Sequence, residues 1–464
     1  MTDWATFLRV KDTHVYNALS RRLFRLSDDD RDPIGRSQPS RRKFDWRDFY
    51  PSDGIETGDR LSFASPTSEA IRNQAASIIV LDITEECNLR CSYCLYSHND
   101  RGVRLHSSRR ANTSYVEAAS RLVRDLATSD TMVGFFGGEP LLHFDSVETI
   151  LRRLTAGRSQ HFGGCTLTTN LTVLDDRMID CFREFAVDLV VSLDGPPGIH
   201  DRYRRTASGA GTHSTVLKNL QQLLARDAEY FERHVWCNCV VAPPLDLAAL
   251  DRFFERCGLP FRGIRFPLVS ENVRGMFANY ETLHEDFDHW CIGQLKSQSP
   301  TSPEGISSLL QYAVRSRLLP LCKPPSTPTT VIPYSSCIPG YKVHVRLDGR
   351  LAVCTECEDL TIGDLDRGID HAAVADLVEQ YMRIRQQECG NCWVAGLCEP
   401  CFANMVRHGH LSVAALREHC GRFRNTMARW LAFLIDGLQQ TETLRTFISE
   451  SLTLADRDSR STPI

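Results

Sequence analysis

Short apolar runs and longer amphipathic stretches alternate between about residues 78 and 270. The apolar runs are rich in β-branched side chains, which is typical of strands that are buried on both faces. The stretches between them carry apolar residues at helical spacing, as in SYVEAASRLVRDLA and HSTVLKNLQQLLARD. This alternation predicts successive βαβ units and one parallel sheet. The expected strands are SIIVLDI, MVGFF, TLTT, DLVVSL, WCNCVV and IRFPLV.

Six such units predict an α/β fold, either a partial (β/α)6 barrel of parallel strands or a wound sheet. We expect the partial barrel. In both folds ligands bind at the carboxyl ends of the strands. The first four strands are each followed by a polar or glycine-rich stretch: TEECNLRC, GGEP, TNL and DGPPGIHDRYR. One such stretch could be an ordinary βα turn, but four on the same rim predict a functional site.

The pattern changes outside this region. The first residues alternate apolar and polar positions around an asparagine-centred turn, which predicts a small hairpin-like unit. A Pro-, Ser- and Arg-rich stretch follows it, and a cysteine-rich stretch and a last amphipathic helix follow the barrel. We expect an N-terminal unit at 1–29, a linker at 30–75, the barrel at 76–320, a small cysteine-rich domain at 321–425, and a C-terminal helix and tail at 426–464.

Composition narrows the classes of function. The chain has 464 residues, of which 42% are hydrophobic and 24% charged, and a net charge of −4, so it should be globular with no basic field for nucleic acid. It has no apolar run of about 20 residues and no signal-peptide pattern. We therefore expect no membrane or nucleic-acid partner and a cytoplasmic location. In that reducing compartment, clustered cysteines among the 18 present indicate metal binding.

Three cysteines follow the first predicted strand at a spacing of C-x3-C-x2-C. Cys87, Cys91 and Cys94 cannot complete a tetrahedral zinc site, and three thiolates would make a catalytic zinc a poor Lewis acid. An iron–sulfur cluster suits them better, because its thiolate ligands often come from one loop. A [4Fe–4S] cluster held by three thiolates keeps one iron open for another ligand.

This loop resembles the signature of the radical S-adenosylmethionine (SAM) enzymes, C-x3-C-x-aromatic-C, with Tyr93 as the aromatic residue. The resemblance implies that SAM chelates the open iron. One electron, from a donor such as ferredoxin or flavodoxin, then cleaves SAM to a 5′-deoxyadenosyl radical that abstracts hydrogen from a substrate. The chemistry belongs to the cofactor, and the protein positions it.

The other rim stretches resemble the SAM contacts of the same family. GGEP matches a family element in which glycines leave room for a polar ligand and a carboxylate meets the SAM ammonium. Arg205 is an alternative to Arg204 in HDRYR. No catalytic side chain beyond the cofactor contacts can be identified. The cofactor contacts that the resemblance implies are Tyr93, Gly137, Gly138, Glu139, Asn170, Ser192, Asp194 and Arg204.

The later cysteines resemble the SPASM extension of radical SAM enzymes, which holds two auxiliary [4Fe–4S] clusters and would bring the total to three. Two zinc sites are the alternative. One auxiliary cluster would take Cys337, Cys354 and Cys401, with Cys322 as the expected fourth ligand, Cys357 as its competitor, or an open iron. The other cluster would be held by Cys389, Cys392, Cys398 and Cys420.

Enzymes with this extension mostly modify peptides, and residues 1–29 resemble the leader-binding unit of ribosomal-peptide maturases. The alternative for this unit is a cap on the barrel. We therefore predict a maturase that abstracts hydrogen from a precursor peptide and forms a thioether or carbon–carbon cross-link. One alternative is a maturase of a protein active-site residue, as in anaerobic sulfatase maturation. Another is a non-catalytic zinc-ribbon interaction protein. The peptide, the residue attacked and the oligomeric state cannot be predicted.

Overall fold

The fold is described from a computed structural model of the chain. Some stretches lie outside the described residues, among them most of the expected linker and the predicted cluster ligand Cys337. The described residues are 7–10, 14–17, 22–25, 62–63, 76–97, 104–156, 162–300, 302–322, 330–331, 339–389, 392–395, 397–398, 401–440 and 442–458.

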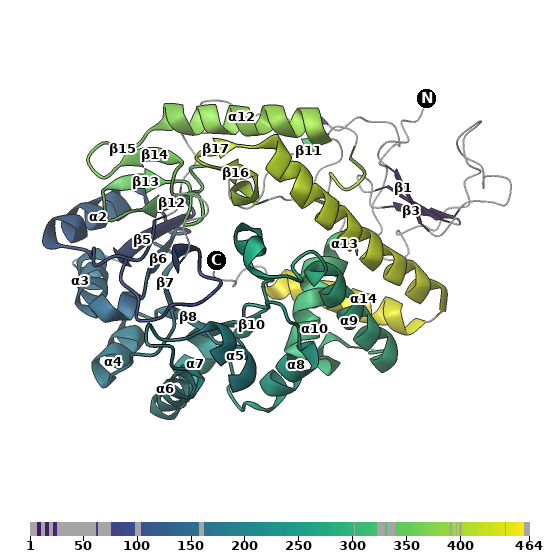
Figure 1. Cartoon of the computed structure of the whole chain (residues 1–464), viewed down its shortest axis with the longest axis horizontal. Coiled ribbons are helices and arrows are strands. Elements are labelled where there is room, and N and C mark those ends of the chain that lie inside the picture. Colours follow the sequence, from purple (N-terminus) through teal and green to yellow (C-terminus); the bar gives the residue numbers. More distant parts are fainter. Residues whose placement is uncertain are drawn as a thin grey trace.

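Six parallel strands form the open barrel, and each pairs with the next strand along the chain. The predicted partial (β/α)6 barrel is therefore confirmed (Figure 1). Its curved sheet places the carboxyl ends of all six strands on one rim. The strands are β5 (Ile78–Thr84), β6 (Met132–Gly137), β7 (Gly164–Thr169), β8 (Asp188–Ser192), β9 (Val235–Asn238) and β10 (Gly263–Arg265).

Helices cover the outer face of these strands. Alternation along β5 sends Leu81 into the helix-facing core with Val116 and Ala119, and sends Asp82 and Thr84 toward the barrel interior. Several helices begin at a capping side chain, as at Asn112, which accepts a hydrogen bond from Tyr115 N. The helices are α2 (Thr113–Leu126), α3 (Phe144–Thr155), α4 (Asp176–Glu184), α5 (Pro197–Tyr203), α6 (His213–Arg226), α7 (Ala228–His234) and α8 (Leu247–Arg256).

The cysteine-rich region extends the barrel sheet beyond its first strand. Strand β12 (Lys342–Val345) pairs in parallel with β5, and three antiparallel strands continue outward from it, which gives ten strands in one sheet. The second cysteine region is thus attached directly to the strand that carries the first cysteine loop. The added elements are β13 (Arg350–Ala352), β14 (Thr361–Asp364), β15 (Gly368–Ile369) and the covering helix α12 (His371–Cys389).

The remaining helices build a second apolar core on the other side of the barrel opening. Phe287, Leu310, Trp430 and Phe447 are fully buried there. None of the described helices is long and apolar enough to cross a membrane. The elements are α9 (Leu283–Gln298), α10 (Ser308–Ala313), a π-helical turn η8 (Val314–Leu318), α11 (Leu319–Cys322), α13 (Val413–Gln440) and α14 (Glu442–Asp458).

The N-terminal residues form a small antiparallel sheet with the strand order β1-β2-β3, where a hairpin-like unit was expected. β1 (Phe7–Val10) lies against α13 (Figure 1). β2 is His14–Asn17 and β3 is Arg22–Arg25. The short elements elsewhere are β4 (Ser62–Phe63), β11 (Thr330–Val331), β16 (Val406–Arg407), β17 (His410–Leu411), η4 (Leu95–Ser97), η5 (Pro140–His143), η6 (Glu271–Met276), η7 (Pro303–Gly305) and η9 (Phe402–Met405).

Candidate functional site

The three cysteines of the first loop gather at the carboxyl end of β5. The turn is held by a hydrogen bond from Cys94 N to Cys91 O at 3.0 Å and by one from Leu89 N to Cys87 Sγ at 3.4 Å. Burial raises the pKa of Cys87 to about 12 and that of Cys91 to about 11. Without a cation these thiols would stay protonated at neutral pH, so the site suits a metal centre that stabilises thiolates.

The two glycines of GGEP bring the loop after β6 against this cysteine loop. A Cβ on Gly137 would overlap the carbonyl oxygen of Thr84, and one on Gly138 would overlap that of Glu86. In their place, Gly138 N donates to Thr84 O at 2.7 Å and Glu139 N donates to Glu86 O at 2.8 Å. We had expected these glycines to leave room for a ligand. In the structure, what requires them is the close approach of two backbones.

Glu139 lies at the centre of the rim and is 1% exposed. Its carboxylate accepts hydrogen bonds from Asn170 N at 2.6 Å, Thr169 Oγ1 at 2.7 Å and Leu141 N at 3.1 Å. Burial nevertheless raises the pKa of Glu139 to about 7. Because a carboxylate offers about four acceptor positions, one acceptor position remains for a ligand cation.

Asn170 joins Glu139 to the cysteine loop. Its side chain donates to Asn88 Oδ1 at 3.0 Å and lies 3.9 Å from Cys87 Sγ. Sequence reasoning identified Asn170 but not its partners Asn88 and Thr169. Their only signal is their position inside TEECNLRC and TTNL.

A second buried group ties the ends of β8 and α5 to the same loop. Arg204 Nε donates to Asp194 Oδ2 at 2.8 Å, and the Tyr93 hydroxyl donates to the same oxygen. The Arg204 guanidinium lies 5.3 Å from the centre of the Tyr93 ring and opposes the rise of the Cys91 pKa. Arg205, the alternative, is exposed and donates to Gly209 O at 3.2 Å, so the geometry favours Arg204 as the predicted contact.

Ser192 and His200 complete this side of the rim. Ser192 is buried at the end of β8, where it lies opposite Asn238 in the pairing of β8 with β9. His200 accepts a hydrogen bond from Asp194 N at Nδ1, at 3.1 Å, and burial lowers its pKa to about 4. His200 is therefore neutral at pH 7 and supports the Asp194 backbone.

A charged network inside the barrel was not predicted. Asp82, on β5, lies 3.0 Å from His344 Nε2 on β12 and 3.5 Å from Arg104 Nη2. Arg104 Nε also donates to Glu358 Oε1 at 3.2 Å. Among the described residues, only Asp82, His344 and Glu358 bring three possible metal-ligand atoms within 4.8 Å of one another. Because Arg104 and Arg346 already supply two positive charges there, the network does not need a cation.

This network lies between the two cysteine regions. Tyr96, just after the first cysteine loop, stacks on the Arg104 guanidinium at 4.0 Å. Its hydroxyl donates to Thr355 O at 3.0 Å, between Cys354 and Cys357. The only sequence signal was Asp82, a lone acid within an apolar strand.

Four of the later cysteines lie close enough to affect one another's pKa. Burial raises the pKa of Cys389 to about 11 and that of Cys398 to about 12, and the nearby Cys420 thiol adds to both shifts. Cys392 adds to the shift of Cys389. Arg385 is fully buried and lies 4.0 Å from Cys398 Sγ. A buried cation at that distance suits a group of thiolates.

The other predicted group is only partly described. Cys354 and Cys357 are hydrogen bonded to each other, which lowers the pKa of Cys354 and raises that of Cys357. Cys401 lies close enough to act on Cys357. Cys322 ends α11 within the second apolar core, whereas Cys354 and Cys357 belong to the barrel core. We expected Cys322 as a ligand, but the geometry favours Cys357. Both assignments stay predictions.

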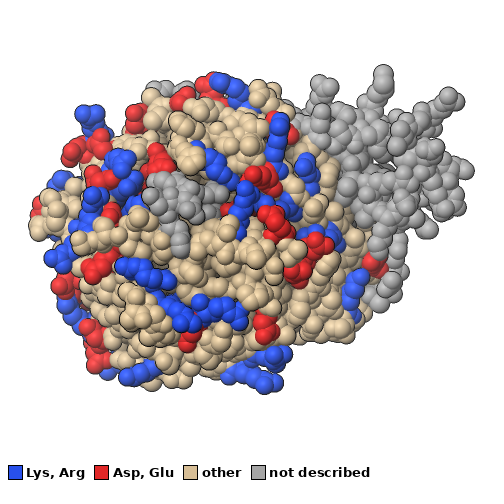
Figure 2. All heavy atoms as spheres, viewed as in Figure 1, with Lys and Arg blue, Asp and Glu red and all other residues tan. Residues whose placement is uncertain are grey.

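Acidic and basic side chains are interspersed over the described part of the face that Figure 2 shows.

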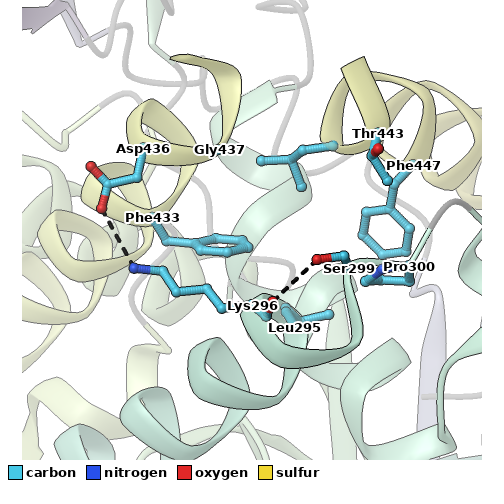
Figure 3. Close-up of a pocket in the computed structure, with 10 residues that line it drawn as sticks. Leu295, Lys296, Ser299, Pro300, Phe433, Asp436, Gly437, Thr443 and Phe447 are labelled. Atoms are coloured by element: carbon cyan, nitrogen blue, oxygen red, sulfur yellow. Dashed lines mark hydrogen bonds and ion pairs between the residues drawn. The ribbon is translucent and has the colours of Figure 1, made fainter. Parts of the chain in front are cut away.

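A separate cavity of about 200 Å³ lies between α9, α13 and α14, where Lys296 Nζ and Asp436 Oδ2 are 3.5 Å apart at its edge (Figure 3). Phe433 and Phe447 form its apolar walls. It contains no cysteine or histidine, so we assign no chemistry to it.

Comparison with known proteins identifies the barrel. Residues 81–257 match the Radical SAM superfamily. This segment is a radical SAM domain. The cysteine loop, GGEP, Asn170, Asp194 and Arg204 all lie within it. A radical SAM domain uses SAM and a [4Fe–4S] cluster, and the thiols of Cys87, Cys91 and Cys94 are the residues that fit the cluster.

Similar proteins match about a third of the chain. The cysteine-type anaerobic sulfatase-maturating enzyme of Clostridium novyi is 26% identical over 34% of this chain and 42% of its own length. The radical SAM cyclopropyl synthase TigE of Paramaledivibacter caminithermalis is 23% identical over 31% of this chain and 32% of its own. The chain therefore spans less than half the length of these relatives.

A solved structure resembles a larger part of the fold. The enzyme anSMEcpe with bound AdoMet and Cp18Cys peptide has a TM-score of 0.53 and 18% identity, and the match covers 76% of this chain and 98% of that one. At this identity the likeness shows the fold alone. It extends well beyond the radical SAM domain.

Proposed function

We propose that this chain is a radical SAM maturase that abstracts hydrogen from a residue of a precursor peptide and forms a thioether or carbon–carbon cross-link. The observation that carries the proposal is the attachment of a second cysteine region to β5 through β12. A radical SAM domain acting alone would not need further clustered thiols beside its cofactor loop. These thiols suit auxiliary clusters that bind substrate or accept the electron left after bond formation.

The proposal gives each rim residue a task. When bound, SAM and its cluster supply the 5′-deoxyadenosyl radical. Glu139 uses its remaining acceptor position for the SAM ammonium, while Asn170 holds the adjoining loop. The Asp194–Arg204 pair fixes Tyr93 in the loop, and burial of the other four side chains would keep water from the radical.

The auxiliary cysteines would hold two further [4Fe–4S] clusters. Cys389, Cys392, Cys398 and Cys420 form the complete set. The other set contains Cys354, Cys401 and Cys357, with Cys337 as its predicted fourth member. A low-potential donor such as ferredoxin or flavodoxin would supply electrons, which suits a cytoplasmic location.

The N-terminal sheet supports an extended peptide as substrate. The outer edges of β1 and β3 both lack a strand partner among the described residues, and because β1 lies against α13, the edge of β3 is the one that we consider. A peptide leader could add to that edge as a fourth strand, since unpaired backbone groups there offer hydrogen bonds. The alternating side chains of Arg22–Arg25 would then contact the leader on both faces.

A second candidate is maturation of a cysteine or serine in a protein active site. The 26% identity to the cysteine-type anaerobic sulfatase-maturating enzyme of Clostridium novyi favours it. The two candidates share the radical step and differ only in substrate. The radical SAM domain makes a non-catalytic zinc-ribbon protein the weakest alternative.

Anaerobic reconstitution tests the proposal. Three clusters predict about 12 iron and 12 sulfide per chain, and a Cys87→Ala, Cys91→Ala, Cys94→Ala variant should keep about 8 of each. With SAM and dithionite the native chain should release 5′-deoxyadenosine, and the variant should not. Two zinc ions without sulfide, or no 5′-deoxyadenosine from the fully loaded chain, would contradict the proposal.

Substrate class is then tested with peptides deuterated at carbon. A cross-linking maturase should transfer deuterium to 5′-deoxyadenosine from a leader-bearing peptide, and it should lower the mass of the unlabelled peptide by about 2 Da, the mass of the two hydrogens lost. A sulfatase-type maturase should instead act on a short peptide that contains the sulfatase cysteine or serine. Truncation of residues 1–29 should abolish only the first reaction.

A further inference from the structure

A second pocket lies at the open edge of the barrel sheet, on the last strand and away from the cysteine loops. It encloses about 690 Å³ between β9, β10, α10 and the π-helical turn η8. That volume is within the range of small-molecule sites. β10 is separated from β5 by four strands, so the pocket is distinct from the predicted SAM contacts.

The polar lining of this pocket is positively charged. Arg262, Arg265 and Arg315 line it together with hydroxyl and amide side chains, and none of its lining residues is acidic. Arg262 is already engaged by Asp188 at 3.6 Å and by Arg233 O at 2.9 Å. The lining therefore presents donors and positive charge to whatever enters.

Arg265 is the least compensated of the three arginines. Its guanidinium stacks on the Trp236 ring at 5.6 Å and has no hydrogen bond or ion pair within the described part of the chain. Burial lowers its pKa, and Tyr312 is the only neighbour that counteracts this shift. A partly buried charge without an anion is unfavourable, so a bound anion would stabilise the folded protein here.

Trp236 adds an independent sign of a missing partner. It is 9% exposed, and its indole N–H is buried without a hydrogen-bond acceptor in the described residues. Its ring is fixed by Gly263, where a Cβ would come within 2.5 Å of the ring. Buried donors normally have acceptors, so this wall of the pocket has a second polar group whose partner is missing.

The fourth wall has an unusual backbone. Residues Val314–Leu318 form a π-helical turn, which is rare and occurs often at functional sites. This turn carries Arg315 and Ser316 in the pocket lining. Together with Arg265 on β10 it provides donors from two elements that are far apart in sequence.

We propose that this pocket binds a small anionic molecule through a carboxylate or phosphoryl group, with Arg265 as its main partner. The planar guanidinium matches either oxyanion with two parallel hydrogen bonds. The exposed Arg262 and Arg315 attract the anion to the mouth. Trp236 and Tyr312 provide an apolar wall for the rest of the molecule. This site does not depend on the proposed maturase activity.

Calorimetric titration of the full-length protein tests the site, with inorganic pyrophosphate and succinate as separate probes. We expect saturable binding of at least one of them, and the probe that binds identifies the oxyanion. Arg265→Gln should weaken binding about tenfold or more, as loss of a charge-assisted bidentate contact does. The affinity of Arg265→Lys should lie between those of the native protein and Arg265→Gln. This intermediate result would separate loss of charge from misfolding.

The control is Arg383→Gln on α12, because Arg383 is 63% exposed and pairs with Glu379 on the same helix. It should bind like the native protein. Binding should also change tryptophan fluorescence, and Trp236→Phe should remove that change. No saturable binding of either probe, equal binding by Arg265→Gln, or the same signal from chloride at equal ionic strength would overturn the proposal.

Discussion

Replacing Arg204 by methionine tests the electrostatic design of the rim. The side chains of Arg204 and Asp194 are 8% and 0% exposed, so solvent hardly screens the pair. Without Arg204, the Asp194 carboxylate would retain Val240 N at 2.9 Å and the Tyr93 hydroxyl but would lose its positive partner. Removing one member of a buried pair typically costs about 3–5 kcal/mol. We expect the free energy of unfolding to fall by that amount.

The assay is urea unfolding of the metal-free protein, followed by circular dichroism. Arg205→Met is the matched control, because Arg205 is the exposed neighbour and should change stability by no more than about 0.5 kcal/mol. Arg204→Lys keeps the charge and should lie between the two. Loss of the cation should also raise the pKa of Cys91 further, since Arg204 opposes its rise.

Alkylation of Cys91 at a series of pH values, read by mass spectrometry, measures that second effect. The expected result is slower alkylation of Cys91 in Arg204→Met than in Arg205→Met. If both variants lose less than about 1 kcal/mol and alkylate alike, Arg204 does not balance charge at this site and the reasoning fails.

Three further predictions concern the GGEP loop and the second cysteine region. Gly138→Ala should lower the iron retained by the first loop, as measured after reconstitution, because its Cβ would overlap the Glu86 carbonyl. A Glu139 pKa raised to about 7 means that protonation favours the folded state. The contribution of the protonated Glu139 to the free energy of unfolding is therefore complete below about pH 4.5, and it is lost as pH rises through 7. The loss reaches about 3 kcal/mol, and urea midpoints at pH 4.5 and 8 should show it in the native chain but not in Glu139→Gln. Finally, Cys357→Ala should lower the iron content after reconstitution, whereas Cys322→Ala should leave it unchanged. The reverse result would favour Cys322 as the cluster ligand.

Much of the barrel could be predicted because its strands are buried on both faces. β5 and β8 appear in the sequence as largely apolar runs, and the rim loops follow them directly. The grouping of Cys389, Cys392 and Cys398 could be proposed from the sequence because these cysteines are close along the chain. By contrast, the pairing of Asp82 with His344 joins residues about 260 positions apart, and no local pattern encodes it. The close backbone contact that requires glycine at position 138 could not be predicted either, because its partner, Glu86, lies on another loop.

The pairing of β12 with β5 has a consequence for synthesis of the chain. β5 is complete by residue 84, but its outer neighbour begins at Lys342. At about 5–20 residues per second, roughly 15–50 s pass while this buried strand has an unpaired edge. During that interval the nascent barrel presents backbone donors, acceptors and apolar side chains that favour association between chains. We expect chains that stop before residue 342 to aggregate, and early chaperone contact to favour production of the full-length protein.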